Sequence, residues 1–440
     1  MELPLSSSAA PGSSSLDHRE ARRARIAVGI LFFTNGALIS NLLPRYPEIK
    51  DDLGLTNTAF GAAVAAYPLG ALLLGLTAGM LIRRFRSSRV AIAATVITAI
   101  GLLLVGVAPG WIVLALALFL AGAMDAITDV AQNSHGLRVQ RLYKRSIINS
   151  FHAIWSIGAV IGGVMGAAAA ALGVPLLLHL TISAVLFSVA AVASYRWLLA
   201  GPEPTPDAAP TVAEPLAGSL AEPLPASTAS PSPAASPSAT AKPGGTAWRY
   251  ATLLALVVIA AGGAIVEDAG SSWSAIYLSD SLGASAFVAG LGFISLQGMQ
   301  FVGRLLGDRM VDRFGQRAIA RLGGALVLVG MGAALAFPSI PGTIVGFGLA
   351  GFGVATLIPG AMQAADELPG FKPGAGLTIV GWLLRLGFLL SPPLVGAIAD
   401  ASSLRFGLIL VPVAGLLVLI FARVLATRTT TRTATPGADR

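Results

Sequence analysis

The chain has 440 residues, of which 55% are hydrophobic and only 11% are charged, and its formal net charge is +8. This composition excludes a soluble globular domain and is typical of a protein with many membrane-spanning segments. The chain has no cysteine, which excludes a disulfide framework, a thiolate nucleophile and a cysteine metal site. Its basic residues gather in particular connecting loops, so the positive charge does not indicate a nucleic-acid partner.

Hydropathy predicts an all-α polytopic membrane protein with twelve transmembrane helices, each near the ~20 residues that cross a bilayer. The first six spans are expected at about 26–44, 57–82, 89–108, 111–135, 147–170 and 175–198. The second six are expected at about 250–272, 286–308, 318–337, 342–364, 374–398 and 404–426. No A-x-A-like cleavage site follows the first apolar run, so we expect that run to be retained as span 1.

The spans divide the chain into two six-helix bundles with tails and a linker. The expected ranges are an N-terminal tail (1–25), the first bundle (26–200), a linker (201–247), the second bundle (248–426) and a C-terminal tail (427–440). The linker is rich in Pro, Ala and Ser and has no periodicity, so we expect it to be disordered. A simple tether is the favoured interpretation, and a docking or regulatory site is the alternative.

Lysine and arginine collect in the loops after spans 2, 4 and 8, whereas the turns after spans 3, 5 and 9 carry no charge. Because basic loops stay in the cytoplasm, both termini and the linker are expected there. The basic residues of these loops are Arg83, Arg84, Arg86, Arg89, Arg138, Arg141, Lys144, Arg145, Arg309, Arg313, Arg317 and Arg321.

The two halves of the sequence can be superposed at a constant offset of 229 residues. At this offset Leu120–Gly122 falls on Leu349–Gly351, and Arg83–Phe85 falls on Asp312–Phe314. A duplicated six-span unit joined by a linker is the plan of secondary transporters whose halves move around a central site.

The loops after spans 2 and 8 carry a related glycine- and arginine-rich motif. The second copy reads GRLLGDRMVDRFG and includes Gly303, Arg304, Asp312 and Arg313. It resembles the loop signature of the major facilitator superfamily. The first copy reads GMLIRRFR and includes Gly79, Arg83 and Arg84, with Arg83 where the superfamily has Asp. In the superfamily that acid helps to hold the cytoplasmic ends together, a role that the resemblance leaves to Asp312.

Shorter segments resemble the YbjJ-like bacterial branch of this superfamily. They are Arg45–Pro47, Asp129–Asn133, Phe151–Gly158, Glu267 with Trp273–Tyr277, and Ser391–Gly396. The resemblance implies secondary transport, with spans 1, 4, 7 and 10 lining the central cavity, and it supplies no substrate. We therefore expect a monomer in the bacterial cytoplasmic (inner) membrane that moves a small organic solute by rocker-switch alternating access.

Span 4 carries a polar stripe in an otherwise apolar helix. Asp125, Asp129 and Asn133 are spaced i, i+4, i+8, with Gln132 beside them, so they share one face. A carboxylate costs about 2.5–3.5 kcal/mol at the bilayer centre, so this face should turn away from lipid. Asp129 is the first proton-coupling candidate, Glu267 the second and Asp125 the third; permanent structural pairing is the alternative. Gln132 and Asn133 either bind substrate or orient Asp129.

The stripe has no counterpart in span 10. The positions that match Asp125, Asp129 and Asn133 are Val354, Ile358 and Met362, and Pro359 can open that helix. The polar site is therefore expected to be asymmetric.

Three further charged residues are candidates for the gate or for ion pairing. Arg45 and Glu267 sit at similar depths in spans 1 and 7, so we expect them to meet as an outer gate; two independently solvated charges are the alternative. Arg385 in span 11 needs an acidic or carbonyl partner. Asp125, Asp129 and Glu267 remain open as that partner, and a structural clamp is as acceptable as anion binding.

The other cavity candidates are Asn35, Tyr67, Trp155 and Trp382. The aromatic rings among them either stack on a solute or only pack against neighbouring helices. His152 is expected to be a hydrogen-bonded structural residue rather than a proton relay. The glycines of span 5 suit close helix contact, and this span lacks the Gly-Pro pair of the drug/proton antiporter signature.

No P-loop and no metal-ligand spacing is present, so we expect no enzyme activity, metal or cofactor. The function predicted is proton-coupled secondary transport of a small organic solute. The alternatives are a uniporter or an exporter of amphipathic compounds and, in another class, a non-transporting membrane sensor or scaffold.

Overall fold

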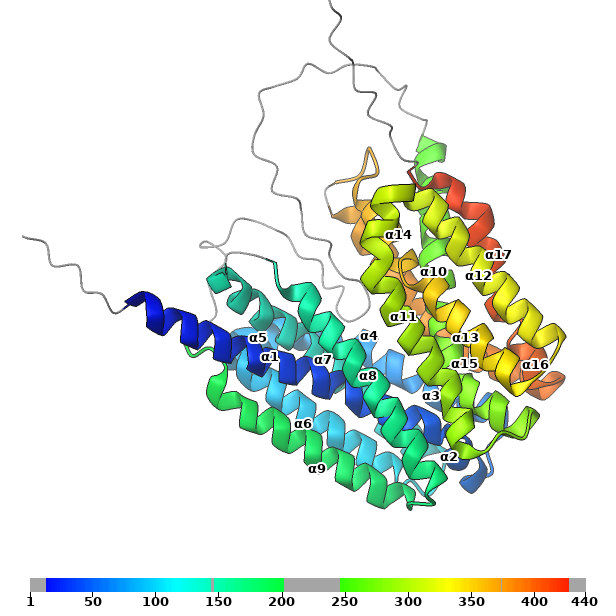
Figure 1. The fold of residues 1–440 in the computed structure, drawn as a ribbon, viewed down its shortest axis with the longest axis horizontal. Helices are drawn as coiled ribbons and strands as arrows, with labels where there is room; N and C mark the ends of the chain where they lie inside the picture. The colour runs from blue at the N-terminus through cyan, green and yellow to red at the C-terminus, as the bar shows by residue number, and fades with distance from the viewer. Residues whose placement is uncertain (1–12, 144–145, 202–245, 373, 427–440) are drawn as a thin grey trace, which may run out of the picture.

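The computed structural model describes residues 13–143, 146–201, 246–372 and 374–426 (Figure 1). Within them, twelve helical stretches are long and apolar enough to cross a membrane, which confirms the predicted number of spans. The expected linker, the C-terminal tail and the loop residues Lys144 and Arg145 lie wholly or largely outside the described residues.

The first half runs from α1 to η3. Its elements are α1 (Ser13–Leu42), η1 (Leu43–Arg45), α2 (Tyr46–Asp52), α3 (Asn57–Val64), α4 (Ala66–Leu74), η2 (Gly75–Thr77), α5 (Ala78–Phe85), α6 (Ser87–Val105), α7 (Trp111–Tyr143), α8 (Ile148–Ala171), α9 (Leu176–Ser194) and η3 (Tyr195–Trp197). The first helix begins at Ser13, well before the expected start of span 1, because helix continues through the basic segment.

The second half runs from α10 to η6. Its elements are α10 (Thr246–Ile276), η5 (Tyr277–Ser281), α11 (Ala286–Phe314), α12 (Gln316–Ala336), α13 (Ile340–Val354), α14 (Leu357–Asp366), α15 (Ala375–Ala401), α16 (Leu404–Gly407), α17 (Leu410–Phe421) and η6 (Ala422–Val424). Together the halves form an all-helical membrane fold.

Proline explains two breaks inside spans. Span 10 is divided between α13 and α14 at Ala355, four residues before Pro359. Span 2 is divided between α3 and α4 at Ala65, three residues before Pro68. A proline ring clashes with the carbonyl four residues earlier and removes a hydrogen bond, so the helix opens there.

Glycine brings α8 against α1. Side chains built on Gly158, Gly162 and Gly166 would collide with the backbone carbonyl groups of Phe33, Ala37 and Asn41. Both sets repeat every four residues and so lie on single helix faces. The expected close contact of span 5 is therefore present, and its partner is span 1.

The two halves meet at one end of the bundle. We call the end that holds residue 201 and Thr246 the linker end, and the opposite end the far end. The ribbons of the halves diverge toward the linker end and meet at the far end, where α2 and α3 lie against the second half (Figure 1). Backbone contacts there join Gly61 to Pro392 and Gly396 to Asn57.

The turns after α5 and α11 share one backbone conformation. Gly315 has φ 84° and ψ 151°, and Arg86, at the matching repeat position, has φ 75° and ψ 146°. Arg86 is the non-glycine residue with positive φ in the described chain. An L-residue in this region is strained by about 1–3 kcal/mol.

Replacing Arg86 by Gly is therefore expected to raise the free energy of unfolding by about 1 kcal/mol, because glycine adopts this conformation without a Cβ clash. Gly315→Ala is the matched control and should lower it by a similar amount. Thermal melting of both variants in detergent measures the effect, and a lower melting temperature for Arg86→Gly would contradict it.

Candidate functional site

A network of polar side chains joins α1, α7 and α8 in the first half. Asn35 on α1 donates from Nδ2 to Asp125 Oδ1 at 2.6 Å, and its Oδ1 accepts from Trp155 Nε1 at 2.8 Å. Gln132 Nε2 also points at Asn35 Oδ1, at 3.4 Å. The Tyr67 hydroxyl on α4 lies beside Asp125. The structure thus brings five of the sequence-predicted candidates together.

Asp129 lies one turn from Asp125 and is 3% exposed. Its Oδ1 accepts from Asn133 Nδ2 at 3.2 Å and faces Gln132 Nε2 at 3.4 Å. Its Oδ2 is buried without a hydrogen-bond partner among the described residues. The amides therefore orient the carboxyl group, and one oxygen remains available to bind a proton or a ligand. We call Asn35, Asp125, Asp129, Gln132, Asn133 and Trp155 the polar cluster.

Arg385 connects the polar cluster to the second half. It lies half-buried on α15, and the acid whose charge acts on it is Asp129 of α7. Of the three partners left open by the sequence, Asp129 is the one whose charge acts on Arg385. Trp382 lies three residues earlier on the same helix, is 47% exposed, and shares a face with Arg385.

Two neighbouring acids occupy the second half. Glu267 on α10 is buried, and its Oε2 accepts from Gln300 Nε2 on α11 at 2.9 Å. Asp268 lies beside Ser391 of α15, and its Oδ1 accepts from Ser272 Oγ at 3.5 Å. The electrostatic influence of Asp268 extends to Tyr46 of α2 in the first half.

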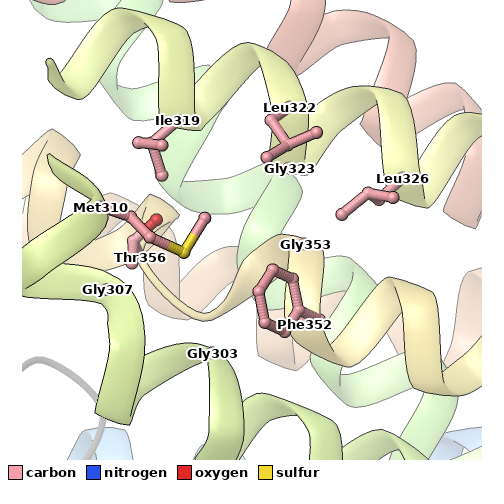
Figure 2. A pocket seen from close by; sticks show the side chains of 10 residues that line it. All are labelled: Gly303, Gly307, Met310, Ile319, Leu322, Gly323, Leu326, Phe352, Gly353 and Thr356. Carbon is pink, nitrogen blue, oxygen red and sulfur yellow. The ribbon is translucent and has the colours of Figure 1, made fainter. Parts of the chain in front are cut away.

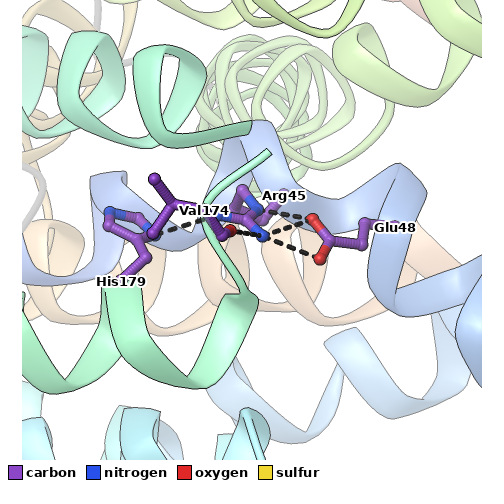
Figure 3. Close-up of polar contacts among 4 residues, drawn as sticks. All are labelled: Arg45, Glu48, Val174 and His179. Atoms are coloured by element: carbon purple, nitrogen blue, oxygen red, sulfur yellow. Dashed lines mark hydrogen bonds and ion pairs between the residues drawn. The ribbon is translucent and has the colours of Figure 1, made fainter. Parts of the chain in front are cut away.

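The expected pair of Arg45 and Glu267 is not formed, although the halves meet at the far end. Arg45 is 1% exposed and binds Glu48 with both ends of its guanidinium group, at 2.6 Å from Nε and 2.7 Å from Nη2 (Figure 3). Its Nη2 also donates to the Val174 carbonyl at 2.9 Å. A bidentate acid three residues away satisfies Arg45 locally, so no direct bond to Glu267 is left to make.

His179 closes the other side of Arg45 (Figure 3). The side-chain amide of Asn41 donates to the Ala37 carbonyl, so its Oδ1 accepts from His179 Nε2 at 2.9 Å. The other ring nitrogen, Nδ1, then faces Arg45 Nη1 at 3.5 Å as an acceptor. These residues all belong to the first half, so Arg45 is part of a buried clamp between α1, η1 and α9.

Polar contacts between the halves lie at the far end. Lys50 Nζ is 3.1 Å from Asp280 Oδ2. Asp400, at the end of α15, accepts from the backbone N–H groups of Asn57 (3.0 Å) and Thr58 (2.7 Å) and from Asn57 Nδ2 (2.9 Å). We call these bonds the far-end contact.

The loop motif lies at the linker end. Arg84 stacks on Phe85 and Arg313 on Phe314, so the two repeats share this arrangement. Arg83 lies over Gly79, and Asp312 is exposed. On the adjoining part of α11, the charge of Arg304 acts on His152 of α8. The His152 ring also packs edge to face on the Phe32 ring, with 5.2 Å between the ring centroids.

A small apolar pocket lies at the break in span 10, between α11, α12 and α13 (Figure 2). Gly303 and Gly307 form one wall, and Phe352, Gly353 and Thr356 form another. A side chain on Gly303 would come within 2.6 Å of Ala355 Cβ. The first glycine of the loop motif therefore makes room for the broken helix, and the lining offers no charged group to a polar solute.

Several polar residues of these contacts escaped the sequence interpretation: Asn41, Glu48, Lys50, His179, Asp268, Asp280, Gln300 and Asp400. Most lie near span ends, where a polar side chain is expected to be exposed to water and so gives no sign of a specific partner. Asp268 directly follows Glu267, and this pair of neighbouring acids within a span was the sequence feature that could have identified it. In the part of the chain that the structure describes, no group of three or more His, Asp or Glu side chains could hold a metal ion.

Comparison with known proteins agrees with this architecture. An uncharacterized transporter of Sinorhizobium fredii, y4wD, is 27% identical over 90% of this chain and 96% of its own length. A crystal structure of a mutant of the nucleoside transporter NupG has a TM-score of 0.68 at 13% identity, covering 91% of this chain and 99% of its own. A bacterial homolog of the human lysosomal transporter Spinster, in an inward-facing and unoccupied conformation, has a TM-score of 0.66 at 14% identity, covering 94% and 98%.

These low identities to solved structures establish the fold and nothing about the solute. The family model described as Major Facilitator Superfamily matches residues 28–310 and 253–440, which together span both halves. The chain therefore belongs to the Major Facilitator Superfamily.

Proposed function

We propose that the chain is a proton-coupled secondary transporter that moves a small organic solute by rocker-switch alternating access. The observation that carries this proposal is the electrostatic link between Asp129 of the first half and Arg385 of the second. A buried acid that faces a cation on the opposite half can change its charge as the halves move. Proton binding and conformational change are then one event.

Because loops rich in lysine and arginine favour the cytoplasmic side, we assign the linker end to the cytoplasm of a bacterium and the far end to the outside in this proposal. With this orientation, the conformation described is closed to the outside by the far-end contact. The cycle requires a second conformation in which the far ends separate and the linker ends meet. The gate is therefore the far-end contact rather than a bond between Arg45 and Glu267.

The polar cluster is the proposed solute site of the first half. Together with Tyr67, which lies beside Asp125, it presents amides, carboxyl groups and two aromatic rings, which suit a polar solute with a ring or several hydroxyl groups. We expect a monomer without catalytic activity, resident cofactor or nucleic-acid partner. Membership of the YbjJ-like branch remains a prediction.

The test begins with a thermal-shift screen of candidate solutes on the purified protein. Flux of each stabilising solute is then measured in liposomes with and without an imposed pH gradient. Flux that follows the gradient supports proton coupling. Saturable flux that ignores the gradient supports the uniporter, and flux of amphipathic compounds out of the cytoplasm supports the exporter.

Deleting residues 205–243 separates transport from the scaffold or sensor alternative. If the linker is a tether, the deletion variant should keep at least about half of the wild-type flux, because the two bundles and the sites between them are unchanged. A scaffold that binds its partner through the linker should lose that partner. Flux and partner capture are measured on the same two proteins, and loss of flux with normal folding would contradict the tether.

A further inference from the structure

Asp268 lies where three elements of the closed far end converge. Its carboxyl group is beside Ser391 of α15, which immediately precedes the Pro392 carbonyl that packs on Gly61 of α3. Its charge also acts on Tyr46 of α2. Asp268 therefore faces the first half across the contact that must open during the cycle.

One oxygen of this carboxyl group has nothing to bind. Oδ2 is buried and lacks a hydrogen-bond partner among the described residues, while Oδ1 has only Ser272 Oγ at 3.5 Å. A buried carboxylate needs a cation or several donors to remain charged. Two hydroxyl groups, those of Ser272 and Ser391, do not meet that need.

The charged and titratable groups around Asp268 do not supply a cation. On its own helix the neighbour is Glu267, which has the same sign of charge. On α2 the near group is Tyr46, and on α15 it is Ser391. Arg385 lies six residues from Ser391 along α15, about 9 Å at 1.5 Å per residue, and its acid is Asp129.

The charged groups of the far-end contact and the Arg45 guanidinium group are engaged elsewhere. Arg45 and Glu48 bind each other, Lys50 binds Asp280, and Asp400 caps α3. A charged Asp268 beneath the closed far end would thus be a buried anion without compensation.

Aromatic side chains of the two halves pack together at the far end. Phe60 of α3 meets Tyr46 at 5.2 Å and Trp273 of α10 at 6.0 Å between ring centroids, both edge to face. This aromatic contact joins side chains of both halves and includes Tyr46, on which the charge of Asp268 acts. Separation of the far ends would split the contact and expose its surroundings to water.

We propose that Asp268 is a proton-binding residue of the outer gate: the far end closes over its neutral carboxyl group, and loss of the proton to water holds the far end open. The proposal rests on the alternating access of the proposed function but assigns a second acid, in the other half, with a role separate from Asp129. Asp129 and Arg385 link proton binding to the solute site, whereas Asp268 makes closure of the outer gate depend on pH.

The test measures the width of the far end directly. Because the chain has no cysteine, spin labels can be attached to cysteines placed at Asp52 and Ser281 alone, which are exposed and lie in opposite halves near the Lys50–Asp280 contact. Pulsed electron paramagnetic resonance then gives the fraction of molecules with separated far ends between pH 5 and pH 9. In the labelled wild type this fraction should rise severalfold with pH.

Asp268→Asn keeps the shape and cannot ionise, so its far end should stay closed at every pH. Asp268→Ser is a second neutral variant in case the first folds poorly. Glu267→Gln is the matched control and should keep the pH response, because Glu267 binds Gln300 within its own half. An open fraction that does not change with pH in the wild type, or that changes equally in Asp268→Asn, overturns the proposal.

Two further outcomes are decisive. An open fraction that follows the sodium concentration at constant pH would identify a metal-cation site and overturn proton binding at Asp268. Proton-driven flux measured on the same protein separates the two hypotheses: normal coupling with a pH-independent far end would refute the role of Asp268 and leave the proposed function standing.

Discussion

Asp129→Asn is expected to reduce proton-driven flux about 100-fold. The substitution keeps the hydrogen bonds to the amides of Gln132 and Asn133 but removes both the proton site and the negative charge that acts on Arg385. A charged side chain without compensation at the bilayer centre costs about 2.5–3.5 kcal/mol. At 1.4 kcal/mol per factor of ten, the loss corresponds to roughly two orders of magnitude in the population of the conformation that needs this pair.

The measurement is flux of a screened solute into liposomes with an imposed pH gradient. Asp125→Asn is the matched control, because Asp125 lies one turn away and is held by Asn35; its flux should fall about tenfold or less. Proton-driven flux of Asp129→Asn at the wild-type level would show that the proton binds elsewhere. Equal losses in both variants would indicate that the polar cluster acts as one structural unit.

Asp400→Ala is expected to shift the protein toward the conformation with separated far ends by about tenfold. One carboxylate accepts three hydrogen bonds from α3, two of them from backbone N–H groups that α3 cannot satisfy within its own first turn. Charge-assisted hydrogen bonds contribute about 1.5–3 kcal/mol when buried, and these exposed ones should contribute about 1–2 kcal/mol together. That energy corresponds to a population ratio of roughly ten.

The spin-label pair at positions 52 and 281 measures this shift at constant pH. Asp280→Asn is the control, since it removes a single exposed ion pair with Lys50, worth at most about 1 kcal/mol. A distance distribution in Asp400→Ala that matches the wild type would contradict the assigned strength of the contact. A loss of melting temperature with no change in distance would mean that Asp400 stabilises α3 alone.

The number of spans, the repeat and the polar stripe were predictable because each depends on local sequence. A 3.6-residue period places Asp125, Asp129 and Asn133 on one face whatever surrounds them. Pro359 likewise breaks its own helix without help from neighbours. The meeting of Asn35, Trp155 and Asp125 was expected only as a shared cavity, and the structure adds the bonds.

Contacts between helices were harder to predict, because they depend on rotation and tilt that the sequence pattern does not set. Arg45 and Glu267 have matching depths, yet Glu48 is three residues from Arg45 and always within reach. Depth alone ignored that nearer partner. Asp268 was overlooked beside Glu267, although neighbours in a helix point about 100° apart and so face different elements.

The backbone contacts of Gly61 with Pro392 and of Gly396 with Asn57 affect which interactions set the free-energy difference between the two conformations. Where the interface is made from glycine and main chain, it has few rotamers to freeze or release, so sliding along that part changes side-chain entropy little. The polar bonds at the rim of these contacts then carry a large share of the energy that sets the balance between conformations. That balance can be tuned by single substitutions that leave the buried apolar packing, and hence the stability of each half, almost untouched.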